Sequence, residues 1–157
     1  MTPAPDRPAL QRTLVLVKPD GVRRGLVGEV LRRIEAKGYG VVALDLRVPD
    51  RATLEQHYAE HAGRPFYDPL LEFMSAGPVA VIVAEGLRVI EGFRSLAGAT
   101  EPTLAAPGTI RGDLGREWGT PAQQNIVHGS DSPESAAREI AIWFPAGAGA
   151  GRSPAPA

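Results

Sequence analysis

Four short apolar runs stand out along the chain, at residues 12–17, 39–48, 77–86 and 126–127. Each is rich in Val, Leu or Ile and is bounded by residues that favour turns, which predicts buried β-strands. The run at 77–86, GPVAVIVAEG, is the clearest candidate for the central strand of a sheet.

Between these runs, apolar residues recur at helical spacing, and the last such segment has the strongest start signal. Ser130, Asp131 and Ser132 are residue types that cap helix N-termini. Pro133 suits the first helical position, and Glu134 favours the positive end of the helix dipole. The predicted helices cover residues 26–36, 51–61, 68–74, 87–96 and 133–144.

The resulting element order is β-α-β-(α-α)-β-α-loop-β-α. Without the extra helices this is βαββαβ, which predicts an α/β fold of the α+β sandwich type: a ferredoxin-like, four-stranded antiparallel sheet with helices packed on one face. A doubly wound sheet is the alternative, but it needs more strands. Residues 97–124 show little periodicity, and long ordered loops are usually functional.

Length, composition and charge narrow the class of protein. A chain of 157 residues predicts one domain, at 12–144, between flexible tails at 1–11 and 145–157 that are rich in Pro, Ala and Gly. A net charge of -1 provides no global field for nucleic acid or membrane, and no apolar run is long enough to span a bilayer. The absence of cysteine, together with a start that lacks a secretory signal, favours the cytoplasm.

Several polar residues could carry chemistry, and each also has a structural explanation. His128 lies between a short strand and a helix start, where anions bind readily, but a turn histidine that only packs is equally compatible. Lys18 follows the first strand in a charged turn. His57 and His61 have the i, i+4 spacing of a metal pair; because no third ligand of matching character follows, an exposed helix face is favoured.

A second group suits phosphate. Arg94, Thr100 and Arg111 lie in or beside the long loop, and arginine binds phosphate through forked hydrogen bonds, although solvated loop arginines are common. The chain lacks the glycine-rich cradle of P-loop enzymes and the protein-kinase signatures. Phosphate chemistry in this chain would therefore use a histidine as the nucleophile.

The motif NIVHGSDS, at 125–132, resembles the active-site signature Asn-x-x-His-Gly-Ser-Asp of nucleoside diphosphate kinases. Other segments match the family in the same order along residues 12–144: VKPDGVRRGLVGEVLRRIEAKGY, HYAEHAGRPFY, SAGPVAVIVAEG and PGTIRGD. The resemblance implies transfer of the terminal phosphoryl group of a nucleoside triphosphate, mainly ATP, to a nucleoside diphosphate, which maintains NTP and dNTP pools. The implied route is ping-pong, through a phosphohistidine, with Mg²⁺ carried by the nucleotide.

The resemblance also assigns roles to individual residues. His128 is the implied nucleophile and Glu139 the carboxylate that orients it, with Ser130 and Tyr58 beside that pair. The implied nucleotide-binding residues are Lys18 and Asn125 at the sugar, Lys18 also near the transferred phosphate, Arg94, Thr100 and Arg111 at the phosphates, and Phe66 with Leu70 at the base. Stacking on an aromatic face tolerates every base, which suits broad substrate use. Gly129 is expected to leave room for a phosphate close to the backbone.

The chain departs from the family pattern at residues 114–124, where the connection to the histidine is about four residues longer than usual; insertions in surface loops cost little stability. Trp118 in this segment could cap the base pocket or pack against a neighbouring subunit. The family implies a homo-oligomer built on dimers, a hexamer or a tetramer, with the strand at 39–48 in the shared contact. A module of the same fold with weak or no catalysis is the alternative, and a histidine phosphocarrier would not need the base and sugar contacts.

Overall fold

The computed structural model describes residues 8–149; residues 1–7 and 150–157, which include most of the two expected tails, lie outside the described residues. Four strands form one sheet in the order β2-β3-β1-β4. They are β1 (Leu10–Val17), β2 (Gly40–Arg47), β3 (Val79–Leu87) and β4 (Val127–Gly129). All neighbouring pairs are antiparallel, which confirms the ferredoxin-like sheet and excludes the doubly wound alternative.

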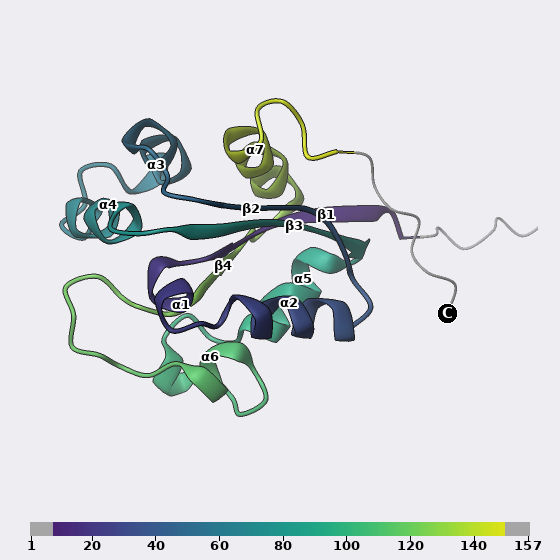
Figure 1. Ribbon diagram of the computed structural model, residues 1–157, viewed down its shortest axis with the longest axis horizontal. Coiled ribbons are helices and arrows are strands. Elements are labelled where there is room, and N and C mark those ends of the chain that lie inside the picture. The colour runs from purple at the N-terminus through teal and green to yellow at the C-terminus, as the bar shows by residue number, and fades with distance from the viewer. Residues whose placement is uncertain (1–7, 150–157) are drawn as a thin grey trace, which may run out of the picture.

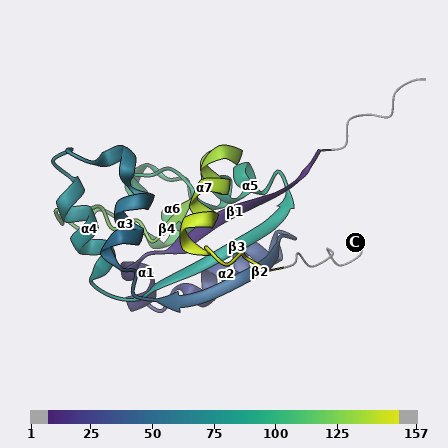
Figure 2. The same cartoon turned by 90° about the horizontal axis from the view of Figure 1, so that it is seen from above.

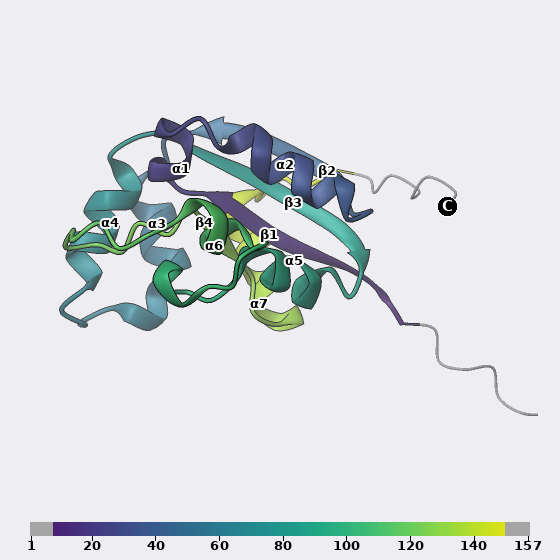
Figure 3. The same ribbon diagram turned by 90° about the horizontal axis from the view of Figure 1, so that it is seen from below.

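Helices cover both faces of this sheet, so the expectation of helices on one face is wrong (Figure 1). Figure 2 looks onto the face that carries α3 (Arg51–His57), α4 (Tyr67–Ser75) and α7 (Pro133–Trp143). Figure 3 looks onto the opposite face, with α2 (Val27–Ala36) and α5 (Val89–Ala97). Covering both faces explains why the central strands are continuous apolar runs and do not alternate with polar residues.

Side chains of the two central strands alternate between two separate cores. In β1, Val15 and Val17 pack with α2 and α5, whereas Leu14 and Leu16 pack with α3, α4 and α7. All four are fully buried. Successive residues of a strand point to opposite faces of the sheet, and each helix turns one apolar face towards the sheet. The molecule therefore has three packed layers: helices, the sheet, and helices again.

Three short elements lie where the sequence predicts turns or loops. The turn after β1 is the helix α1 (Pro19–Arg23), and the long segment at 97–124 contains a 3₁₀ turn, η2 (Pro102–Leu104), and the helix α6 (Ile110–Leu114). The predicted helix at 51–61 divides at Tyr58 into α3 and the 3₁₀ turn η1 (Ala59–His61). Helices of one or two turns contain too few residues to show a 3.6-residue period, so the pattern could not predict them.

The ordered chain extends past the last helix. Residues 145–149, which belong to the expected C-terminal tail, lie against the sheet: Ala148 is buried in the core of the α7 face, and Gly149 O accepts a hydrogen bond from Arg12 Nη1 at 3.2 Å. No helix within residues 8–149 is long and apolar enough to cross a membrane.

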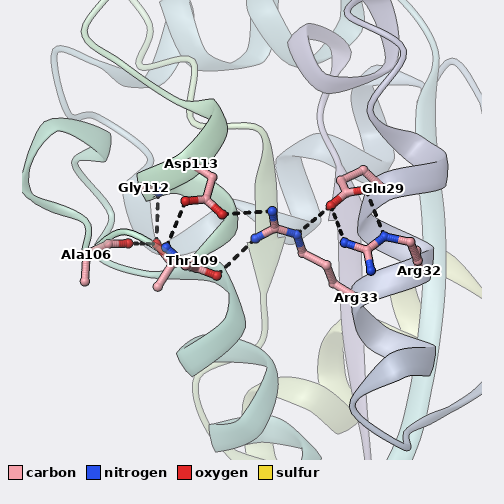
Figure 4. A network of polar contacts seen from close by, with 8 residues as sticks. Glu29, Arg32, Arg33, Ala106, Thr109, Gly112 and Asp113 are labelled. Atoms are coloured by element: carbon pink, nitrogen blue, oxygen red, sulfur yellow. Dashed lines mark hydrogen bonds and ion pairs between the residues drawn. The ribbon is translucent and has the colours of Figure 1, made fainter.

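A polar network connects α2 to α6 (Figure 4). Arg33 donates to Glu29 on its own helix at 2.8 Å, and also to Gly108 O at 3.1 Å and Asp113 Oδ2 at 2.9 Å. Thr109 caps α6 by accepting from the Gly112 amide at 2.9 Å. The network holds α6 in place, and α6 carries one of the expected phosphate ligands, Arg111.

Candidate active site

His128 is the middle residue of β4, opposite Leu16 in the register with β1. The chain then leaves the sheet, and α7 begins at Pro133 after Ser132 caps it, its side chain accepting from the Ser135 amide. His128 is thereby held on a rigid strand at the edge of the sheet, next to the start of a helix. It lines a cavity of about 310 Å³.

The imidazole of His128 is oriented by a buried carboxylate on α7. Its Nε2 lies 2.9 Å from Glu139 Oε1, and the same oxygen accepts from the Ser130 hydroxyl at 2.7 Å. Ser130 Oγ in turn accepts from the Leu14 amide of β1 at 3.1 Å. Glu139, Ser130 and the central strand therefore form a fixed support for the ring.

These contacts determine which nitrogen of the His128 ring carries the proton. Burial alone would raise the pKa of Glu139, but the hydrogen bond and charge of His128, together with the hydrogen bond of Ser130, outweigh burial and hold this pKa below its usual value. An ionised Glu139 accepts the proton of Nε2, so the neutral ring has its lone pair on Nδ1. A neutral imidazole with one fixed N–H and one free lone pair is an activated nucleophile.

Lys18, Asn125 and Thr100 form a chain of contacts along the cavity. Lys18 Nζ donates to Asn125 Oδ1 at 2.8 Å, and Asn125 Nδ2 donates to Thr100 O at 2.9 Å. Burial, and to a lesser degree the charge of Arg111, lower the pKa of Lys18 to about 8, while Asp20 acts in the opposite direction. Lys18 is therefore a cation at neutral pH that can become neutral under mildly alkaline conditions.

Two arginines contribute positive charge from different elements. Arg111, on α6, is nearly buried and donates to three backbone carbonyls, those of Gly98, Asn125 and Val127. Burial and the charge of Arg94 lower the pKa of Arg111 to about 10, so it remains charged at pH 7. Arg94, on α5, is exposed and also lines the cavity.

A second histidine, His57, lies beside His128, which the sequence did not predict. His57 is buried and not on an exposed helix face, and its ring centroid lies 4.7 Å from that of His128. His57 Nδ1 accepts from Trp143 Nε1 at 3.0 Å, and burial together with the charge of His128 lowers the pKa of His57 to about 3. The signal in the sequence that could have located His57 at the site is its helical spacing with Tyr58 and His61. All three residues line the cavity.

Three possible metal ligands, His57, His128 and Glu139, have donor atoms within 4.8 Å of one another. The hydrogen bond from Trp143 fixes the proton of His57 on Nε2, and a protonated nitrogen has no lone pair for a metal. His57 and His61 do not form the metal pair considered from their spacing. His57 therefore cannot complete a three-ligand metal site with His128 and Glu139.

The remaining expected residues lie at different depths. Tyr58 is buried beside His57, and burial raises the pKa of its hydroxyl. Phe66 caps the start of α4 and is exposed at the cavity rim, with its ring centroid 5.1 Å from that of His61; Leu70 lies one turn further along α4. Neither Phe66 nor Leu70 lines the cavity itself.

Gly129 lines the cavity but has a packing role as well. A Cβ at this position would lie 2.6 Å from Phe93 Cδ1, so only glycine allows β4 to approach α5 this closely. Four further polar or charged side chains that line the cavity had no expected role in the chemistry: Glu60, Asp131, Ser135 and Arg138.

The inserted segment at 114–124 is attached to the end of α1. Arg24 donates to Leu114 O at 2.7 Å and Arg23 to Gln124 Oε1 at 3.3 Å. Two guanidinium carbons lie close to the Trp118 ring, that of Arg116 at 4.0 Å and that of Arg24 at 5.3 Å from the ring centroid. Trp118 does not line the cavity, so the possibility that it caps the nucleotide pocket receives no support from this arrangement.

Comparison with known proteins agrees with this geometry. A family model described as nucleoside diphosphate kinase matches residues 11–148. The chain is 61% identical over 136 residues to a nucleoside diphosphate kinase of Streptomyces griseus, covering 86% of this chain and 96% of the relative. It is also 61% identical over 137 residues to one of Mycobacteroides abscessus, covering 87% and 98%.

Solved structures give the same assignment. A nucleoside-diphosphate kinase of Borrelia burgdorferi, described as a transition state mimic with vanadate and ADP, matches with a TM-score of 0.81 and 41% identity, covering 86% of this chain and 87% of that one. One from Halobacterium salinarum in complex with CDP matches with a TM-score of 0.81 and 43% identity, covering 87% and 88%. The chain therefore belongs to the nucleoside diphosphate kinase family and shares its enzymatic activity, the phosphorylation of nucleoside diphosphates.

Proposed function

We propose that the chain transfers the terminal phosphoryl group of a nucleoside triphosphate, mainly ATP, to a nucleoside diphosphate through a phosphohistidine at Nδ1 of His128. The observation that carries this proposal is the contact between His128 Nε2 and Glu139 Oε1 at 2.9 Å, in a cavity that is also lined by Lys18, Arg94 and Arg111. The contact leaves Nδ1 as the nucleophilic nitrogen, and the cations stabilise the charge of the transferred group.

The reaction consists of two half-reactions. In the first, the Nδ1 lone pair forms an N–P bond to the γ-phosphorus while the bond to the bridging oxygen breaks, and a nucleoside diphosphate leaves. In the second, a terminal phosphate oxygen of the acceptor attacks the phosphohistidine, and the N–P bond breaks. The Nε2 proton remains shared with Glu139 throughout, which stabilises the positive charge on the phosphorylated ring.

Nucleotide recognition is proposed to divide between the inside and the rim of the cavity. Lys18 and Asn125, which are bonded to each other, would together bind the sugar hydroxyls, and Thr100 would join the arginines at the phosphates. Phe66, at the exposed rim, offers a flat face for the base, with Leu70 beside it. The relatives solved with ADP and with CDP support a site that accepts both a purine and a pyrimidine.

We further propose Mg²⁺ as the cofactor, held by the nucleotide. The lining residues support this arrangement, because Lys18, Arg94, Arg111 and Arg138 are cationic and Glu139 is already bonded to His128 and Ser130. Mg²⁺ prefers phosphate oxygens and water where the protein offers no full set of carboxylates, and it neutralises phosphate charge there.

For the assembly, we propose a homo-oligomer built on dimers, a hexamer or a tetramer, acting in the cytoplasm as a single catalytic domain. The support for association is an exposed apolar stripe on and just after the edge strand β2, formed by Leu44, Leu46 and Val48, each more than half exposed. An unpaired edge with apolar side chains is a favourable surface for contact with another copy.

The direct test is incubation of the protein with ATP and Mg²⁺ in the absence of acceptor. Intact mass and peptide mapping should locate one acid-labile phosphate on His128, and addition of GDP should discharge it into GTP. Absence of the phosphate from folded protein that binds ATP would instead support a module of this fold without turnover.

The pKa of Lys18 gives a prediction for the pH profile. The cation is present below pH 8 and is lost as the pH rises through about 8, so kcat/KM should fall on the alkaline side with an apparent pKa near 8. Lys18→Arg keeps the charge at all these pH values; the variant is less active but should lose this limb of the profile. An unchanged alkaline limb in Lys18→Arg would assign the titration to another group.

A further inference from the structure

The backbone between Asn125 and His128 contains a strained turn. Ile126 has φ of 74°, although it is β-branched and fully buried. The Val127 amide donates to Asn125 O at 2.8 Å, which closes a γ-turn centred on Ile126. A γ-turn with positive φ at its centre is rare and strained, and such a conformation persists only where the surroundings enforce it.

The groups that enforce this turn come from two segments of the site. The Ile126 amide donates to Asp20 Oδ2 at 3.0 Å, and Ile126 O accepts from the Lys18 amide at 2.7 Å. On the other side, Arg111 donates to Asn125 O at 3.1 Å and to Val127 O at 2.6 Å. Backbone groups of the turn are thus bonded to Lys18, Asp20 and Arg111.

Through its carboxylate, Asp20 accepts a side-chain hydrogen bond from the Ile126 amide. Its side chain is almost completely buried, and among residues 8–149 no group hydrogen-bonds to its other carboxylate oxygen, Oδ1. Its neighbour Gly21 allows a close approach, because a Cβ there would lie 3.1 Å from both Ile126 Cγ2 and Ile126 O. Burying a carboxylate with an unsatisfied oxygen is costly, and the hydrogen bond from the Ile126 amide offsets part of that cost.

The turn sets the distance between two parts of the site. Asn125, at its start, is bonded to the Lys18 amine, and His128 follows its end by one residue. Relaxation of Ile126 to negative φ would rotate the peptide groups on both sides and move Asn125 and Lys18 relative to the His128 ring. A misplacement of about 1 Å can lower a rate about 100-fold.

We propose that Asp20 is a positioning residue whose carboxylate oxygen holds the γ-turn at Ile126 and thereby aligns Asn125 and Lys18 with His128. The kinetic part of this proposal rests on the proposed function, since it is measured as phosphorylation of His128. The structural part does not, since the hydrogen bond of the Ile126 amide can be observed without turnover.

Four variants of the full chain separate the hydrogen bond from the negative charge. Asp20→Asn retains an oxygen acceptor and removes the charge, whereas Asp20→Glu retains the charge and moves the acceptor by one methylene. Asp20→Ala removes both. Asp50→Ala is the matched control, because Asp50 also accepts a backbone amide, that of Thr53 at 2.7 Å, but caps α3 away from the site.

Two quantities are measured below the melting temperature of every variant: amide hydrogen exchange at Ile126, and the single-turnover rate of His128 phosphorylation by ATP with Mg²⁺. Asp20→Ala and Asp20→Glu should each accelerate Ile126 exchange at least about tenfold and lower the rate about 10- to 100-fold. Measured well below the pKa of Lys18, which the charge of Asp20 raises, Asp20→Asn and Asp50→Ala should stay within about threefold of the parent protein in both quantities.

The proposal is overturned if Asp20→Asn loses the rate while Asp20→Glu keeps it, since the charge beside Lys18 would then be the cause. It is equally overturned if Ile126 exchange is unaffected by Asp20→Ala. Should Asp20→Ala not fold, the Asn and Glu variants still decide between acceptor and charge. If the parent protein takes no phosphate on His128, the proposed function fails, while the exchange measurements still test the role of Asp20 in the turn.

Discussion

Replacing His128 with asparagine should reduce kcat for phosphoryl transfer by at least about 10⁴-fold, because the reaction then lacks its nucleophile. Neither remaining histidine can substitute. His57 has its Nδ1 bonded to Trp143 and is held neutral by burial, with its only lone pair directed at that indole. His61 lies towards the rim, beside Phe66, without a carboxylate partner to orient its ring among the hydrogen bonds of residues 8–149.

The measurement combines steady-state synthesis of GTP from GDP with phosphate incorporation from ATP. Asparagine is smaller than histidine and leaves Glu139 with the Ser130 hydroxyl, so the fold and the affinity for ADP should be retained. ADP binding within a few-fold of the parent protein is the control for an intact cavity. A folded His128→Asn variant that keeps more than about 1% of the activity would require a different nucleophile.

The parts of the fold that could be predicted from the sequence are those with a long or unbroken pattern. The runs at 12–17 and 77–86 predict β1 and β3 because residues 14–17 of β1 and 79–84 of β3 each lie in one core or the other. The helix at 133–144 was predicted from its start, where Ser132 caps and Pro133 begins α7. The short α1 and α6 could not be predicted, since five residues do not complete two helical turns.

The candidate site divides in a similar way. The resemblance placed His128, Lys18, Arg111 and Asn125 together, and the structure brings all four to one cavity. The burial of His57 could not be predicted, because it depends on Trp143, which is 86 positions away in the sequence.

The γ-turn at Ile126 was equally inaccessible to sequence patterns. Isoleucine disfavours positive φ, so a local pattern predicts a strand there. The conformation is imposed by Asp20, 106 positions away. Long-range contacts of this kind override local preference at sites where function requires an unusual geometry.

Arg111→Ala should have two separable effects. Kcat/KM should fall by about 10³-fold, because a charged donor beside the transferred phosphoryl group is lost. The free energy of unfolding should also fall by about 3 kcal/mol, because the buried carbonyls of Asn125 and Val127 and the part-buried carbonyl of Gly98 lose their donor. Nucleotide transfer assays and urea unfolding measure the two effects independently.

Arg94→Ala is the matched control, because Arg94 lines the same cavity but is exposed on α5. It should lower kcat/KM about 10- to 100-fold and change the free energy of unfolding by no more than about 0.5 kcal/mol. Equal loss of stability in the two variants would contradict the anchoring role of Arg111. Three of the five N–H groups of the Arg111 guanidinium bind backbone carbonyls, which leaves two for phosphate. Unaltered kcat/KM in Arg111→Ala would show that these two are not needed for phosphate and that the guanidinium only holds the backbone.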